Sequence, residues 1–272
     1  MSPILIQALA AALYLAIALA IWRSHRPLGE PLGANVLRAS LLAPLAVHAL
    51  WLAINMTTPG ALQFGFAPAL SITLWLTVVI YWIESFFLRL DGLLAIALPL
   101  AALAVLLPAA FPGFALPLEA DATALRVHLL TAMVAYSLFT VAALQGLVMA
   151  ILERRLHAGT LSGVFTHVPP LLTLERVLFR IIGAGLLLLT VALVTGVLFS
   201  ETLFGRALRI DHKTVFALLS WVIFAALLAG RWLRGWRGRT ALRWIVAGFV
   251  CLLLAYIGSR FVFEVILGRS PV

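Results

Sequence analysis

The amino-acid sequence predicts an all-α fold: a polytopic bundle of eight transmembrane helices. Its 272 residues are 64% hydrophobic and only 11% charged, whereas soluble domains are roughly 45–50% apolar and about 25% charged. The mean hydropathy is +1.13. Eight separate apolar stretches each have the roughly 20 residues that a helix needs to cross a hydrocarbon core of about 30 Å. This composition excludes an ordinary soluble globule, a disordered chain and a disulfide-rich secreted module.

The first four predicted spans follow one another closely. They cover residues 3–22, 35–55, 66–87 and 92–110. No basic residue precedes the first span, Arg23 and Arg26 follow it, and no clear small-residue cleavage site is present, which favours an uncleaved anchor with its N-terminus outside. The third and fourth spans are joined by the short turn Leu88–Asp91, and Pro99 and Pro108 weaken the helical pattern of the fourth.

The last four predicted spans cover residues 127–151, 177–199, 213–232 and 241–264. The connection between the fifth and sixth, residues 152–176, is the longest. The sequence contains no internal repeat, low-complexity tract or soluble domain. We therefore expect residues 1–272 to form a single integral membrane domain that acts within the bilayer or at its two faces.

The basic residues predict the orientation of the bundle. With an outside N-terminus, thirteen arginines fall on inner segments: Arg23, Arg26, Arg38, Arg89, Arg154, Arg155, Arg176, Arg180, Arg231, Arg234, Arg237, Arg239 and Arg243. Six basic residues fall on outer segments: Arg126, Arg206, Arg209, Lys213, Arg260 and Arg269. Because basic residues concentrate on cytoplasmic loops, both termini are expected on the outer, periplasmic side of a bacterial-type inner membrane. The net charge of +9 is thereby assigned to topology, and no nucleic-acid partner is expected.

Ionisable residues within the spans are the informative positions, because each costs several kcal/mol unless it is paired or functional. His48 lies thirteen residues into the second span, roughly 20 Å from its inner end at about 1.5 Å per residue. Trp51 and Asn55 share its helical face. His48 is compatible with a hydrogen bond to a neighbouring helix and equally with ligation of a metal or a haem.

More polar residues gather near the outer ends of the fifth, seventh and eighth spans. His128 opens the fifth span among small residues that let a helix or a flat cofactor approach closely, although an interfacial histidine also needs no functional explanation. Asp211 suits a helix N-cap, whereas Lys213 at the same end opposes the helix dipole and predicts an anionic partner. Arg260 precedes Glu264 by four residues, a spacing that allows an ion pair.

Together these residues fit a haem site. Two imidazoles can ligate iron, and nearby cations can bind the propionates. Zinc usually takes three or four protein ligands, and the sequence has no HExxH motif and no cysteine cluster. Cys251 is the single cysteine, so no CxxCH motif is present and the expected cofactor is non-covalent haem b. No phosphate-binding glycine loop or Ser/His/Asp set is recognisable, and the protein is expected not to be an enzyme.

The chain resembles the cytochrome c assembly proteins of the CcsA type. The stretch RIDHKTVFALLSWVIFAALLAGRWLRGWRGR and the later AYIGSRFV carry this likeness. The short YpjD/HemX-like branch is the most similar. It shares a His in the second span, here AVHALWL, a His opening the fifth, here VHLLTAMVAYSLF, and an inner loop like VPPLLTLERVLF. The likeness covers about residues 40–264.

The resemblance implies an eight-helix haem-handling protein that works toward the outer face. In full CcsA-type proteins, a tryptophan-rich outer segment ending in WDPKE holds haem between outer histidines. Phe204 matches the opening Trp of this segment, Asp211 and Lys213 match its Asp and Lys, Trp221 matches the Trp of the next helix, and His128 matches the first outer His.

Other positions depart from that pattern. They are Leu208 and Ile210 in place of tryptophans, His212 in place of the proline, Thr214 in place of the glutamate and Ala229 in place of an intramembrane His. No His follows the final span. These departures count against the attachment of haem to an apocytochrome. They do not count against haem binding by His48 and His128.

The sequence therefore predicts a haem-binding inner-membrane protein of cytochrome c maturation or of the regulation of haem supply. The predicted roles are axial iron ligands for His48 and His128, propionate partners for Lys213 and Arg260, orientation of Lys213 by Asp211, and apolar walls from Trp221 and Phe204. The expected partners are membrane lipid, haem, and other maturation proteins or apocytochrome c. The alternative is a transporter or an accessory subunit of a divalent-cation efflux system. Such a path needs several acidic residues facing the interior, and only Glu84 and Glu264 approach this.

Overall fold

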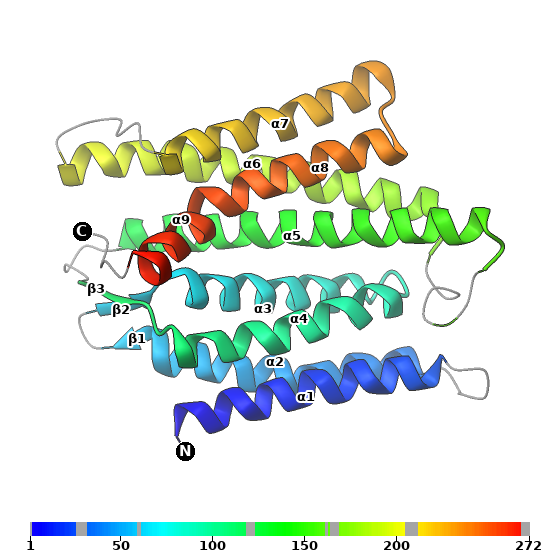
Figure 1. Cartoon of the computed structure of the whole chain (residues 1–272), viewed down its shortest axis with the longest axis horizontal. Helices are drawn as coiled ribbons and strands as arrows, with labels where there is room; N and C mark the ends of the chain where they lie inside the picture. The colour runs from blue at the N-terminus through cyan, green and yellow to red at the C-terminus, as the bar shows by residue number, and fades with distance from the viewer. Residues whose placement is uncertain are drawn as a thin grey trace.

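The computed structural model describes residues 2–25, 32–58, 61–117, 123–160, 163, 169–204 and 212–267. Within these ranges eight helices are long and apolar enough to cross a membrane, which confirms the predicted fold class. The helices lie side by side and alternate in direction (Figure 1). Pro3 and Leu267 lie at the same end of the bundle, which we call the terminal end.

The helices agree with the predicted spans except in two lengths. They are α1 (Pro3–Ser24), α2 (Ala34–Met56), α3 (Phe66–Glu84), α4 (Asp91–Ala110), α5 (Thr123–His157), α6 (Leu171–Phe204), α7 (His212–Arg234) and α8 (Gly238–Leu253). Helix α4 is continuous through Pro99 and Pro108. Helices α5 and α6 have 35 and 34 residues, about 50 Å at 1.5 Å per residue, so both extend beyond a hydrocarbon core of about 30 Å.

The last span changes its helical form. Helix α8 continues without a break through the π-helical segment η2 (Leu254–Gly258), the short helix α9 (Ser259–Phe261) and a second π-helical segment η3 (Val262–Ile266). The sequence predicted one regular helix over 241–264. Each π segment widens the turn and so redirects the side chains that follow, a feature often found near functional sites.

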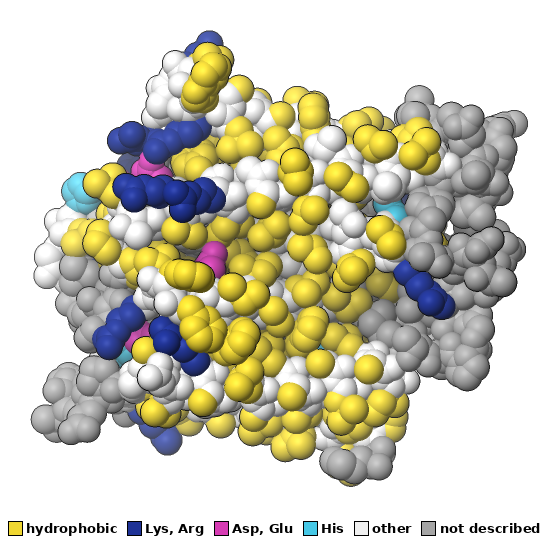
Figure 2. Space-filling model, turned by 180° about the vertical axis from the view of Figure 1, so that it is seen from behind, with side chains coloured by type: hydrophobic (Ala, Val, Ile, Leu, Met, Phe, Trp, Pro, Cys, Tyr) yellow, Lys and Arg dark blue, Asp and Glu magenta, His cyan; other side chains and the backbone are white. Residues whose placement is uncertain are grey.

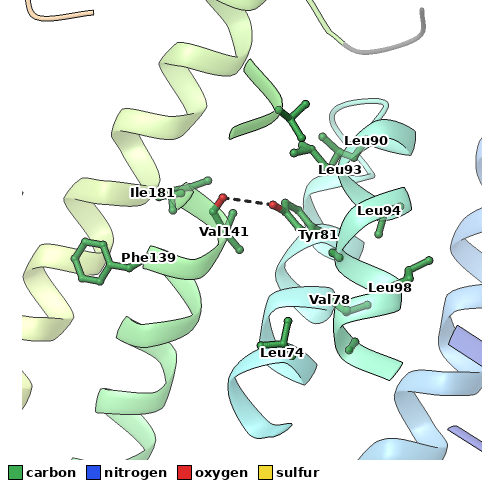
Figure 3. Packing of buried hydrophobic residues seen from close by; sticks show 14 of the residues in the cluster. Leu74, Val78, Tyr81, Leu90, Leu93, Leu94, Leu98, Phe139, Val141 and Ile181 are labelled. Carbon is green, nitrogen blue, oxygen red and sulfur yellow. Dashed lines mark hydrogen bonds between the residues drawn. The ribbon is translucent and has the colours of Figure 1, made fainter. Parts of the chain in front are cut away.

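The bundle consists of two groups of four helices. In the first group, α1 packs on α2 and α4, and α3 packs on α4; in the second, α5 packs on α6 and α8, and α7 packs on α8. Contacts from α3 and α4 to α5 join the groups. Tyr81, fully buried on α3, donates a hydrogen bond to the carbonyl oxygen of Val141 on α5 at 3.4 Å, within a leucine-rich cluster (Figure 3).

A small sheet at the terminal end was not predicted. It contains β1 (Thr57–Thr58), β2 (Ala61–Phe64) and β3 (Phe114–Pro117). Its order is β1-β2-β3, and both pairings are antiparallel, with Phe64 opposite Phe114. The sheet therefore ties the segment after α2 to the segment after α4.

The charged residues divide the surface into zones. The middle of the molecule is covered with hydrophobic side chains, and basic side chains gather toward one end (Figure 2). Among the described residues, twelve arginines lie at or near the end opposite the terminal end, which we call the basic end: Arg23, Arg38, Arg89, Arg154, Arg155, Arg176, Arg180, Arg231, Arg234, Arg237, Arg239 and Arg243. Arg126, Lys213 and Arg260 are the described basic residues of the terminal end. An apolar belt between polar ends suits a protein that crosses a bilayer.

Candidate functional site

His48 is held inside the first helix group. The side chain is fully buried. Its Nδ1 lies 3.2 Å from the hydroxyl oxygen of Tyr14 on α1, and its Nε2 lies 2.9 Å from Oγ of Ser71 on α3. In a neutral imidazole one nitrogen donates and the other accepts, and two hydroxyls can complete both roles. His48 therefore connects three helices by hydrogen bonds.

A cleft opens one helical turn from His48, at the terminal end. It has a volume of about 660 Å³, and its lining includes Gln7, Trp51, Asn55, Gln63 and Phe114. Small-molecule sites commonly measure about 300–1,000 Å³. The Trp51 ring lies 6.3 Å from the His48 ring between centroids, and its buried Nε1 has no hydrogen-bond partner among the described residues. His48 itself does not line this cleft.

His128 lies in the second helix group, between α5 and α6. Its Nδ1 is 2.8 Å from Oγ1 of Thr195, whose hydroxyl also contacts the carbonyl oxygen of Val191 on its own helix. Gly196 leaves room for the ring, since a Cβ there would lie 3.3 Å from Cε1 of His128. A hydrogen bond at Nδ1 orients an imidazole in the way that metal-ligating histidines require, with Nε2 as the ligand atom.

The two histidines have separate surroundings. The polar partners of His48 come from α1 and α3, whereas Thr195 comes from α6. Helix α3 lies between α2 and α5 (Figure 1) and packs on both. A small apolar cluster connects these helices near the terminal end; it contains Phe64, Ala69 and Met133, packed by Leu52, Ile72, Leu76, Leu129 and Tyr256. No described contact joins His48 to His128.

The last span contributes two charged residues, Arg260 and Glu264. They are close enough to attract each other electrostatically, but the direct ion pair that their spacing allowed is not among those formed by the described residues. The Glu264 carboxylate instead accepts from the backbone N–H of Phe66, at 3.3 and 3.4 Å, and so caps the start of α3. The guanidinium carbon of Arg260 lies 5.6 Å from the centroid of the Tyr256 ring.

One buried polar atom in this region, Nε of Arg260, has no hydrogen-bond partner within the described part of the chain. The buried hydroxyl of Tyr256 interacts with the same Arg260 side chain. Tyr256 also packs 5.6 Å from Phe64, between ring centroids, in the cluster that contains Leu129, the residue after His128. An unsatisfied buried polar group costs about 1–3 kcal/mol, so Nε of Arg260 marks a place where a polar ligand is favoured.

The remaining predicted residues take varied positions. Trp221 on α7 donates from Nε1 to Oγ1 of Thr190 at 2.8 Å. Thr190 and Thr195 are five residues apart on α6, about 140° round the helix, so Trp221 and His128 face different sides of it. Lys213 is the second residue of α7 and makes an interaction with another residue. The preceding His212, singled out above as a replacement for a proline, stacks on Phe263 at 5.9 Å. The Phe204 side chain and Asp211 lie outside the described residues.

Sequence reasoning missed the partners of these residues. Tyr14, Ser71 and Thr195 contact the two histidines, and a hydroxyl midway along an apolar span was the only available signal for them. The structure also shows whether side chains could bind a metal ion directly. Within the described ranges, no group of three or more His, Cys, Asp or Glu side chains could hold one.

Comparison with known proteins identifies relatives. YpjD, an inner membrane protein of Escherichia coli K12, is 37% identical over 140 residues, 52% of each chain. An Azospirillum brasilense protein of 28.8 kDa, from the region 5′ of a nifR3-like gene, is 35% identical over 144 residues, again 52% of each chain. The cytochrome c biogenesis protein CcsA of Trichormus variabilis is 37% identical over 86 residues, 32% of this chain and 24% of the relative.

The matched part of the chain is long enough to assign a family. The chain spans about half the length of the first two of these relatives. YpjD is named as an inner membrane protein, and the eight apolar helices of this chain agree with a multi-pass protein of the inner membrane. The model of the cytochrome c assembly protein family matches residues 34–267, from the start of α2 to the end of the last span. The chain belongs to the cytochrome c assembly protein family.

Proposed function

We propose that this protein binds haem b non-covalently at the terminal end of its bundle and handles it for cytochrome c maturation or for the regulation of haem supply. Membership of the cytochrome c assembly family supports the general role. The role is binding and presentation of haem; no side chain is assigned a bond-making step. Other maturation proteins or apocytochrome c would receive or supply the haem.

The observation that carries the proposal is the buried Nε of Arg260, on a side chain that also interacts with the hydroxyl of Tyr256. This Nε has no hydrogen-bond partner in the described ranges, and a carboxylate that accepts a hydrogen bond from it is complementary in charge and in hydrogen bonding. Haem has two propionates of this kind. Lys213, at the start of α7, is proposed as the cation for the second propionate.

His128 fits the role of an axial ligand. Thr195 holds its Nδ1 at 2.8 Å, the side chain is half-buried, and Gly196 keeps the neighbouring helix surface small. When bound, haem supplies an iron that takes an imidazole nitrogen and carboxylates that need cations. Trp221 and Phe204 are proposed as apolar walls, and Asp211 as the residue that orients Lys213.

His48 fits less directly. Both of its nitrogens are occupied by hydroxyls, and no part of the ring is exposed. Its proposed role as an axial ligand therefore requires Ser71 to move away from Nε2. Because His48 and His128 have separate neighbours, the proposal places them at two haem-binding positions and not on one iron.

The test is the absorption spectrum of the purified protein, with haem quantified by the pyridine haemochrome method. We expect a Soret band that His128→Ala reduces severalfold and that Arg260→Gln also weakens. His157→Ala is the matched control, because His157 is an exposed histidine of the basic end. An unchanged band in His128→Ala, or an equal loss in His157→Ala, would contradict the ligand assignment.

A further inference from the structure

A second cavity lies at the basic end, far from the residues proposed for haem. It has a volume of about 490 Å³ and is formed by the start of α6, the end of α7 and the turn that leads into α8. Its charged lining residues are Glu175, Arg176, Arg180, Arg231 and Arg237. Four guanidinium groups thus face one carboxylate, which leaves an excess of three positive charges.

The floor of this cavity is an organised ion pair. The carboxylate of Glu175, nine-tenths buried, lies 2.6 Å from one terminal nitrogen of Arg231 and 3.5 Å from Nε of Arg237. The guanidinium carbon of Arg231 also lies 4.7 Å from the centroid of the Phe179 ring. Both contacts are to one carboxylate oxygen, Oε1 of Glu175, and Arg231 is fixed in direction by a carboxylate and an aromatic ring.

The rim carries the uncompensated charge. Arg176 and Arg180 are four residues apart on α6, so they share one face of the helix. Within the described parts of the chain, neither makes a hydrogen bond or an ion pair. Two exposed like charges at this spacing repel each other, and an anion between them and Arg231 would remove that repulsion.

The apolar surroundings indicate which anion fits. Leu172 and Phe179 line the same cavity, and Leu172 is 68% exposed. At the end of α7, Trp232 and Leu233 are 87% and 72% exposed, and an exposed tryptophan beside arginines is typical of the headgroup level of a bilayer. A ligand that combines a phosphate with hydrocarbon chains matches both kinds of lining.

We propose that this cavity binds the headgroup of an anionic phospholipid, with its phosphate among Arg176, Arg180 and Arg231 and its acyl chains along Leu172. Topology alone requires only that basic residues be numerous at this end. It does not require them to converge from α6, from α7 and from the turn before α8 on one cavity that also contains a buried carboxylate. The site does not depend on haem binding, so either proposal can fail alone.

The test measures lipid binding to the full chain in a zwitterionic detergent, by native mass spectrometry with phosphatidylglycerol added. Arg176→Gln/Arg180→Gln should weaken binding about thirtyfold, because each arginine near an anionic surface contributes about 1 kcal/mol and 1.4 kcal/mol is a factor of ten. The control is Arg154→Gln/Arg243→Gln, which removes two exposed charges from the same end outside the cavity. It should bind nearly as the unaltered protein does.

Two further measurements distinguish binding of a phospholipid headgroup from binding of free phosphate. Phosphatidylcholine, whose headgroup has no net charge, should bind at least tenfold more weakly, and inorganic phosphate at millimolar concentration should not displace phosphatidylglycerol. Displacement by inorganic phosphate would overturn the lipid assignment in favour of a free-anion site. Equal binding by both double variants would overturn the site itself. Thermal unfolding without added lipid shows whether either double variant is misfolded, and Arg176→Lys/Arg180→Lys, which keeps the charge, should restore most of the binding.

Discussion

His48 illustrates how one polar residue can be accommodated in an apolar span. Burying an imidazole without partners costs several kcal/mol, and here Tyr14 and Ser71 supply a hydroxyl to each nitrogen. These hydrogen bonds join α1, α2 and α3 at one point. They are directional, whereas the apolar packing around them is not. His48 is therefore a structural residue in this conformation, whatever further role it has toward haem.

This structural role predicts a loss of stability in His48→Ala. The change leaves a cavity and removes the partners of two buried hydroxyls, so the free energy of unfolding should fall by about 2–4 kcal/mol. Thermal unfolding in detergent measures it. Ser40→Ala is the control, because the Ser40 hydroxyl donates only to the carbonyl of Leu37 in its own helix. Equal unfolding temperatures for the two variants would show that the His48 contacts contribute little.

At this scale the sequence was only partly informative. Hydropathy alone locates the spans, so it could be predicted that polar residues within or near them include His48, His128 and Arg260. Their partners could not, since Thr195 and Tyr256 become neighbours only when helices distant in sequence pack. The Arg260–Glu264 pair failed for the same reason: local spacing allowed it, but the backbone N–H of Phe66 is a competing donor from α3.

The helices show where prediction from apolar length succeeds and where it stops. Helix α4 begins and ends within one residue of its prediction because its apolar run has almost the same length as the helix. Helices α5 and α6 continue past their apolar runs into segments such as Leu171–Arg176, which are polar enough to resemble a loop. The sheet formed by β1, β2 and β3 is too short to give a periodic signal.

The turn between α7 and α8 depends on a close approach of a glycine and an aromatic ring. A Cβ at Gly230 would lie 2.3 Å from a ring atom of Trp236, and Trp236 is itself stacked on Trp244 at 5.0 Å between centroids. The ring has little freedom to withdraw. The absence of a side chain at Gly230 therefore lets Trp236 fold back against the end of α7, beside the floor of the cavity at the basic end.

Gly230→Ala is accordingly expected to destabilise the protein by about 1–3 kcal/mol, the usual cost of overpacking. Gly183→Ala is the matched helical control. A Cβ at Gly183 meets no atom within 4 Å, so alanine should be neutral or should stabilise helix α6 by up to about 1 kcal/mol. Thermal unfolding of the two variants in one detergent compares them. Should Gly230→Ala unfold at the same temperature as Gly183→Ala, the Trp236 contact is not tight.

At the scale of the whole molecule, the two proposed sites lie at opposite ends of the same helix. Thr195, the partner of His128, is nineteen residues along α6 from Arg176, about 28 Å at 1.5 Å per residue. That distance approaches the thickness of the hydrocarbon core. Helix α6 therefore contributes to a proposed haem position near one membrane face and to a proposed lipid position near the other.

The orientation of the bundle follows from its charge asymmetry and is a prediction. Twelve described arginines lie at the basic end, against Arg126, Lys213 and Arg260 at the terminal end. Since translocating basic residues is disfavoured, the basic end should face the cytoplasm and the terminal end, with the proposed haem positions, the periplasm. Alkaline phosphatase, which is active only in the periplasm, should therefore be active when fused to the C-terminus of the full chain.

Green fluorescent protein supplies the complementary measurement, because it becomes fluorescent in the cytoplasm. Fused to the same C-terminus, it should be dark. Inserted at Gly159, an exposed position between α5 and α6 with open space around it, it should fluoresce. The insertion also controls for expression, since both fusions carry all eight spans. Fluorescence from the C-terminal fusion would reverse the orientation, and would put His128 and Arg260 on the cytoplasmic side, where periplasmic delivery of haem is impossible without a larger movement.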